Sequence, residues 1–214
     1  MFTFKRKNSM KLTLMTFSIG FLIFSQYLKS QSDFSALNDQ FLSYNLERTQ
    51  LQKKAMLTLT GWSVLNITAG SIGYFSTSNE SRYFNQMNAG WNIVNLGLGV
   101  FGYLQAKNEF YDDYDLHQSL ESHRKVSNSF LFNGALNVSY ITAGFLLREA
   151  AKNNIDDEMR FRGWGNSLIL QGGFLLAFDM VNFTLHQRNR KRFLDPATLN
   201  ISVRGNELGM VINF

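Results

Sequence analysis

Long uncharged stretches alternate with charged segments along the chain. Residues 55–75, 83–106 and 126–147 contain no charged side chain, and each is long enough to cross the hydrocarbon of a bilayer as a helix. A fourth stretch, 163–178, is shorter and reaches that length only if it continues past Asp179 to Gln187. The helices of a soluble bundle carry a charged outer face, which these stretches lack. The pattern predicts an all-α fold, a membrane-type bundle of four helices.

The order of the stretches predicts two helical hairpins within a helical domain at 33–194. Hairpin 1 covers about 50–107 and hairpin 2 about 124–190. The motif Ile-Thr-Ala-Gly at 67–70 recurs at 141–144, and Gly-Trp at 90–91 recurs at 163–164, with offsets of 74 and 73 residues. These offsets favour a duplicated unit. Because each unit crosses twice, the copies form a parallel repeat.

Small and polar residues recur at steps of three and four within the stretches, which places them on one face of each helix. Glycine allows close helix approach, and Asn amides hydrogen-bond between helices in lipid. The predicted packing positions are Gly70, Gly73, Gly99, Gly102, Gly144 and Gly172. The predicted polar core, which is also the candidate ligand set, comprises Asn66, Asn88, Asn92, Asn95, Asn133, Asn137, Asp179 and Asn182. Structural hydrogen bonding is the favoured role, and a polar path or ligand site around Asp179 is the alternative.

The N-terminal residues 1–32 have the order of a secretory signal: basic residues, then an apolar run from Leu12 to Phe24, then small and polar residues. Cleavage after residue 25, 30 or 32, a true start at Met10 and an uncleaved anchor stay open. Residues 33–54 have one apolar face and predict a separate amphipathic helix.

The C-terminal residues 197–214 alternate between apolar and polar side chains on both sides of Gly205-Asn206. This pattern predicts a short β-hairpin. The terminal aromatic resembles the last strand of an outer-membrane barrel, but one hairpin cannot close a barrel.

The amino-acid composition excludes some kinds of site and favours lipid as a partner. Charged residues form 17% of the chain and aromatic residues 14%, a balance that favours lipid over water. The absence of cysteine excludes thiolate sites and disulfides. The net charge of +5 arises beside the uncharged stretches, so we expect contact with a lipid membrane and not with nucleic acid. No cofactor, metal or catalytic residue is predicted. Asp179 and His186, seven residues apart on one helix face, are the only pair that comes near the arrangement of a catalytic acid and base. The acidic and histidine residues at 109–123 lack the spacing of a calcium-binding loop and predict a solvated helix.

The segments Gly61-Trp62 to Gly70 and Met87 to Asn95 resemble an uncharacterised family of exported bacterial proteins with Gly/Asn-rich helical hairpins. The resemblance covers roughly 35–190 and implies no activity. We therefore expect a structural or interaction protein of the bacterial cell envelope, with a homo-oligomer or an envelope protein as partner. The alternative is a small channel or carrier with an Asn/Asp path. A cleaved export signal would place the basic helix ends on the outer side of the inner membrane. Basic residues at helix ends instead favour the cytoplasmic side. Because the two expectations conflict, the choice of inner or outer membrane stays open.

Overall fold

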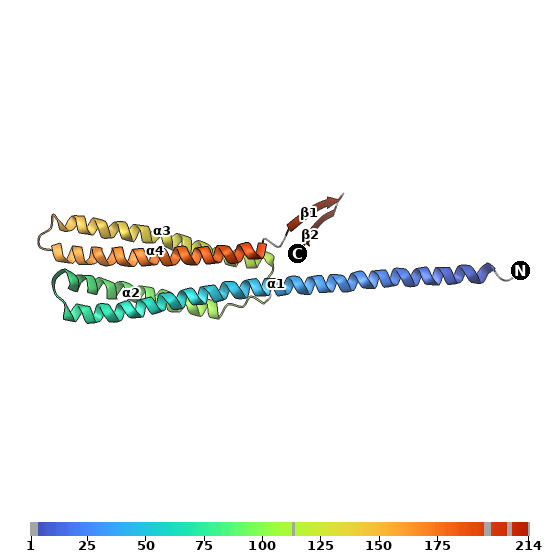
Figure 1. Cartoon of the computed structure of the whole chain (residues 1–214), viewed down its shortest axis with the longest axis horizontal. Helices are drawn as coiled ribbons and strands as arrows, with labels where there is room; N and C mark the ends of the chain where they lie inside the picture. The colour runs from blue at the N-terminus through green and yellow to red at the C-terminus, as the bar shows by residue number, and fades with distance from the viewer. Residues whose placement is uncertain (1–3, 113, 195–197, 205–206, 214) are drawn as a thin grey trace. The chain divides into compact units, whose positions relative to one another are not determined.

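The fold is all-helical apart from two short C-terminal strands (Figure 1). The computed structural model describes the backbone of residues 4–112, 114–194, 198–204 and 207–213, and the side chains of residues 26, 38–112 and 114–194. The helices are α1 (Phe4–Ser76), α2 (Asn79–Lys107), α3 (Leu116–Ala151) and α4 (Glu158–Leu194). Strands β1 (Thr198–Arg204) and β2 (Glu207–Asn213) pair antiparallel. The chain divides into two compact units, Met1–Ser43 and Tyr44–Phe214, and the bundle belongs to the second.

The prediction of a separate amphipathic helix at 33–54 is wrong. The helix α1 continues through this segment to Ser76, because no glycine or proline between residues 33 and 54 interrupts it. Most side chains of 1–37 lie outside the described residues, so the signal at 1–32 stays a prediction. The helix ends at a tight turn in which Asn79 has a positive φ of 56°, a conformation that Asn tolerates better than most residues.

Close glycine contacts join the two helices of each hairpin. In hairpin 1, a Cβ atom at Gly70 would lie 2.8 Å from the backbone oxygen of Asn85. In hairpin 2, a Cβ atom at Gly144 would lie 2.7 Å from the backbone oxygen of Gly165. The other glycines of the predicted packing set also have a neighbouring helix within contact distance: Gly73, Gly99, Gly102 and Gly172. At Gly70 and Gly144 the nearest atoms include backbone atoms of the partner helix, so the two helices approach more closely there than a residue with a Cβ atom would permit. At Gly73 and Gly102 the nearest atoms belong to the side chains of Asn85 and Met56.

The two hairpins are alike in outline but not in every contact. Gly70 and Gly144, which the repeat relates, both lie against the partner helix of their own hairpin. Gly163 instead contacts Tyr83 and Phe84 of α2, whereas a Cβ atom at Gly90 would meet nothing within 4 Å. Duplication therefore stays a prediction, supported at one pair of glycines and not at the other.

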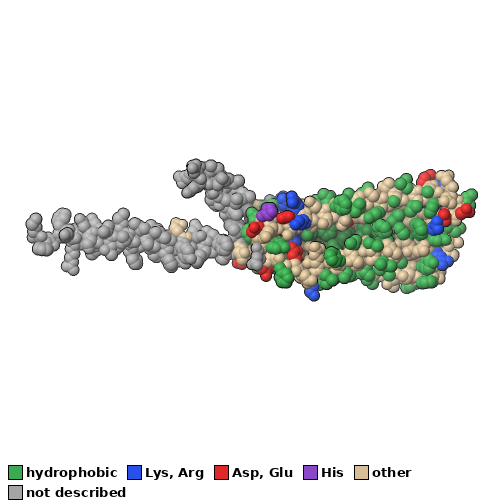
Figure 2. Space-filling view, turned by 180° about the vertical axis from the view of Figure 1, so that it is seen from behind, with side chains coloured by type: hydrophobic (Ala, Val, Ile, Leu, Met, Phe, Trp, Pro, Cys, Tyr) green, Lys and Arg blue, Asp and Glu red, His purple; other side chains and the backbone are tan. Residues whose placement is uncertain are grey.

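Polar side chains fill much of the bundle interior, and apolar side chains cover much of its surface. The buried apolar cluster is small: Ala55, Leu59, Phe130, Leu175 and Phe178. Buried polar side chains outnumber buried apolar ones in the part of the chain that the structure describes. Leu65, Phe101 and Leu146 are 65–70% exposed. Figure 2 shows apolar side chains along the bundle, with charged groups gathered near its two ends.

In the part of the chain that the structure describes, two helices, α3 and α4, are long and apolar enough to cross a membrane by length and composition. This number is lower than the four spans that the uncharged stretches predicted, because Asn, Gly, Ser and Thr lower the mean hydropathy of α1 and α2.

Candidate functional site: a groove between α2 and α3

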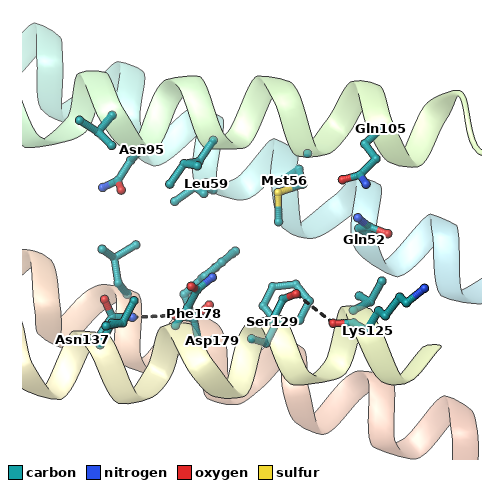
Figure 3. A pocket seen from close by; sticks show the side chains of 18 of the residues that line it. Gln52, Met56, Leu59, Asn95, Gln105, Lys125, Ser129, Asn137, Phe178 and Asp179 are labelled. Atoms are coloured by element: carbon teal, nitrogen blue, oxygen red, sulfur yellow. Dashed lines mark hydrogen bonds between the residues drawn. The ribbon is translucent and has the colours of Figure 1, made fainter. Parts of the chain in front are cut away.

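A groove of about 830 Å³ lies in the bundle and takes lining residues from all four helices. Its walls come mainly from α2 and α3, and its floor comes from Met56 and Leu59 of α1 and from Leu175 and Phe178 of α4. Figure 3 shows Asn95 and Gln105 on one side, facing Asn137 and Ser129 on the other. The volume lies within the range typical of sites for small organic ligands.

One end of the groove is held by a buried ion pair. The Arg48 guanidinium donates from Nη2 to Oε1 of Glu109 at 2.7 Å and from Nη1 to Oε2 at 3.0 Å. The Arg48 side chain is 1% exposed and the Glu109 side chain 19%. The Tyr114 hydroxyl lies 3.4 Å from the same carboxylate. This two-point pairing fixes the loop between α2 and α3 against α1.

The other end contains a buried carboxylate. Asp179 of α4 is 3% exposed, and its Oδ2 atom accepts a hydrogen bond of 2.6 Å from Nδ2 of Asn137 on α3 (Figure 3). Trp91 of α2 and Tyr140 of α3 lie edge to face, with ring centroids 4.7 Å apart. Both rings line the groove and bring its two walls together at this end.

A second polar cluster joins α1, α2 and α4. The Gln171 Oε1 atom accepts a hydrogen bond of 3.0 Å from Nε1 of Trp62, and its Nε2 donates to Oδ1 of Asn88. The Asn88 Nδ2 atom donates to Oδ1 of Asn66 at 3.0 Å. Sequence reasoning missed Gln171, although it lies two steps of four residues before Asp179 on the same helix row.

The predicted polar residues do not all enter these clusters. Asn92 and Asn182 each donate to a backbone oxygen of their own helix, four residues back, and Nδ2 of Asn95 lies 3.4 Å from Oδ1 of Asn92. Asn133 is exposed, so its prediction as a core residue is wrong, but it lines the groove and stays a candidate ligand residue. The reason is that residues of α2 and α3 line a groove at this level, which leaves the Asn133 side chain accessible.

The segment 109–123 is not the fully solvated helix that its charges predicted. Glu109 belongs to the ion pair with Arg48, and His123 is fully buried. The His123 ring stacks on Tyr44, with centroids 5.3 Å apart, and meets the fully buried His186 ring at 5.5 Å. His186 also stacks on Phe130. Asp179 and His186 thus make different contacts, and the described residues contain no group of three or more His, Cys, Asp or Glu side chains arranged to hold a metal ion.

The fold and the groove together define a four-helix bundle with a polar interior and a ligand-sized site. The family described as a family of unknown function (DUF6992) matches residues 58–180, and the chain belongs to this family. The matched region contains the second polar cluster around Gln171, and it also contains Asn95, Asn137 and Asp179 of the groove. No curated protein and no solved structure matches the chain.

Proposed function

We propose that the protein is a membrane-embedded bundle of the bacterial cell envelope that works by binding a partner and not by catalysis. The observation that carries this proposal is the inverted distribution of side chains, with polar groups inside and large apolar groups outside. In water such a surface would be an aggregation hazard. In lipid it is the expected arrangement, because buried amides then find their partners inside the protein.

The positions of the charged residues support the same proposal. The uncharged stretches of α1, α2 and α3 contain 21 to 24 residues, which is roughly 32–36 Å at the helical rise. The hydrocarbon core of a bilayer is about 30 Å thick. Exposed basic residues border the stretches at both ends, with Lys107 and Lys125 at one end and Arg82 and Arg148 at the other. Such side chains extend to the lipid headgroups.

An interaction role fits the site better than catalysis does, because the candidate acid Asp179 has an amide partner in place of a base or a nucleophile. The predicted signal at 1–32 is the reason for proposing export to the envelope. The partners that fit are the lipid membrane itself and either a second copy of the chain or another envelope protein.

Insertion of a charge tests the membrane proposal. Phe101, which is 70% exposed within the uncharged stretch of α2, is replaced by Lys, and Phe110, which is 88% exposed in the following loop, is replaced by Lys as the matched control. A lysine costs about 2.5–3.5 kcal/mol at the bilayer centre, and the cost is smaller for Phe101, which lies roughly 10 Å from the middle of the stretch at the helical rise. We expect F101K to reduce the yield of membrane-inserted protein in alkaline extraction of envelope fractions, and F110K to leave it unchanged. Full extraction of the unsubstituted protein into the soluble fraction would contradict the proposal.

A carrier or channel is the second candidate, and the groove is the specific observation that favours it. The groove gives a path to a carboxylate in a segment where charge is costly, and such residues commonly handle ions or charged substrates. If this is right, Asp179→Asn abolishes solute flux in proteoliposomes, whereas Asp156→Asn, in the exposed loop before α4, does not.

A further inference from the structure

We propose that the end of the groove that contains Asp179 is a binding site for an amphipathic organic cation, namely a protonated or quaternary ammonium or phosphonium group on an apolar body. The inference names the ligand class of the groove. It rests on the proposed membrane function only for the route of entry.

The charge of the site comes from Asp179. It is the only charged side chain in the segment 163–187, and its carboxylate receives one hydrogen bond from Asn137. No lysine, arginine or histidine of the described residues forms an ion pair with it. A buried carboxylate without a counter-charge is stabilised by a cation that binds beside it.

The aromatic residues of the groove favour an organic cation. Trp91, Tyr140, Phe130 and Phe178 line the groove together with Asp179. The faces of aromatic rings attract ammonium-type cations, and this attraction strengthens where water is excluded. The site therefore offers both an anionic group and a π-rich wall.

The chemistry and size of the groove argue against a metal ion as the ligand. A divalent cation such as calcium takes six to eight oxygen ligands at short distance. At this end Asp179 supplies a single carboxylate, and the other polar groups are neutral side chains, among them those of Asn95 and Asn137. The groove, at about 830 Å³, has room for an organic molecule and is far larger than a single metal ion needs. Leu59 and Leu175 form the apolar floor on which such a body packs.

The open side of the groove suits entry from an apolar phase. Val94 and Leu98 on α2 are 60% and 57% exposed, and Leu136 on α3 is 37% exposed. All three also line the groove. A ligand dissolved in lipid thus reaches Asp179 laterally, between α2 and α3, without crossing the charged end at Arg48.

The test compares two probes of nearly equal shape, the cation methyltriphenylphosphonium and the neutral triphenylphosphine oxide, on the purified full-length protein in lipid nanodiscs. We expect the cation to bind at least tenfold more tightly by titration calorimetry. Asp179→Asn removes this preference, and the control Asp156→Asn keeps it. Circular dichroism and size-exclusion chromatography check that each variant is folded.

A second variant, Leu98→Trp, tests the same site in case Asp179→Asn does not fold. Leu98→Trp fills the mouth of the groove and leaves the carboxylate in place, and we expect it to weaken binding of the cation at least tenfold. Equal binding of both probes, no binding of the cation by the unsubstituted protein, or unchanged binding in folded Asp179→Asn would each overturn the inference. Protein that enters the nanodiscs and yet gives one of these results overturns the ligand class alone, whereas failure to insert counts against the proposed function.

Discussion

The contact between α3 and α4 at Gly144 can be tested by adding a single methyl group. In Gly144→Ala the new Cβ atom would lie 2.7 Å from the backbone oxygen of Gly165 and 2.7 Å from Cγ1 of Ile169. Real Cβ atoms do not approach a carbonyl oxygen so closely, and backbone cannot rotate away as a side chain can. The two helices must therefore separate locally.

The matched control is Gly173→Ala, because a Cβ atom at Gly173 of α4 would meet nothing within 4 Å. Both variants gain the same helix propensity, at most about 1 kcal/mol. Their difference in unfolding free energy thus reports the clash at Gly144. Overpacking of this kind costs about 1–3 kcal/mol, and for a chain of this length each kcal/mol lowers Tm by about 2–4 °C.

The measurement is the loss of helical circular dichroism on heating, or on titration with denaturing detergent, for both variants and the unsubstituted protein in the same micelle. We expect Gly173→Ala to equal or exceed the unsubstituted protein in stability and Gly144→Ala to unfold earlier than Gly173→Ala. Equal stability of the two alanine variants would refute the close approach of α3 and α4 at this position.

Three further substitutions test separate parts of the bundle. Gln171→Leu leaves the buried partners of its side-chain amide unpaired, so we expect a loss of about 1–3 kcal/mol in detergent unfolding, against no loss for Gln105→Leu on the exposed rim. Arg48→Met leaves the Glu109 carboxylate without its ion-pair partner and destabilises the protein by up to about 3–5 kcal/mol; adding Glu109→Gln should recover part of this loss, and no recovery would contradict the pairing. Asp115→Ala removes the capping box at the start of α3 and costs about 0.5–2 kcal/mol, measurable as faster amide hydrogen exchange in the first turn of the helix.

Part of the candidate site could be predicted because its physical cause is local. Asn88, Asn92 and Asn95 are all buried, and their spacing alone places them on one helix face. Asp179 stands out because a single carboxylate interrupts a long uncharged segment. Neither pattern reveals which residue on another helix meets these side chains. The pairing of Asp179 with Asn137 and the role of Gln171 depend on the rotation of each helix about its axis, which the contacts between helices determine.

The sequence by itself determined the helical class, the division into hairpins and the glycine positions at the contacts, because helix periodicity and the demand for close approach act over a few neighbouring residues. Tertiary structure decided the rest. It buried His123 and paired Arg48 with Glu109 by bringing α1 against the start of α3. It also left α2 and α3 apart, which opened the groove and exposed Asn133. These features depend on the order in which four helices surround one another, and residues far apart in the chain fix that order through packing and hydrogen bonds.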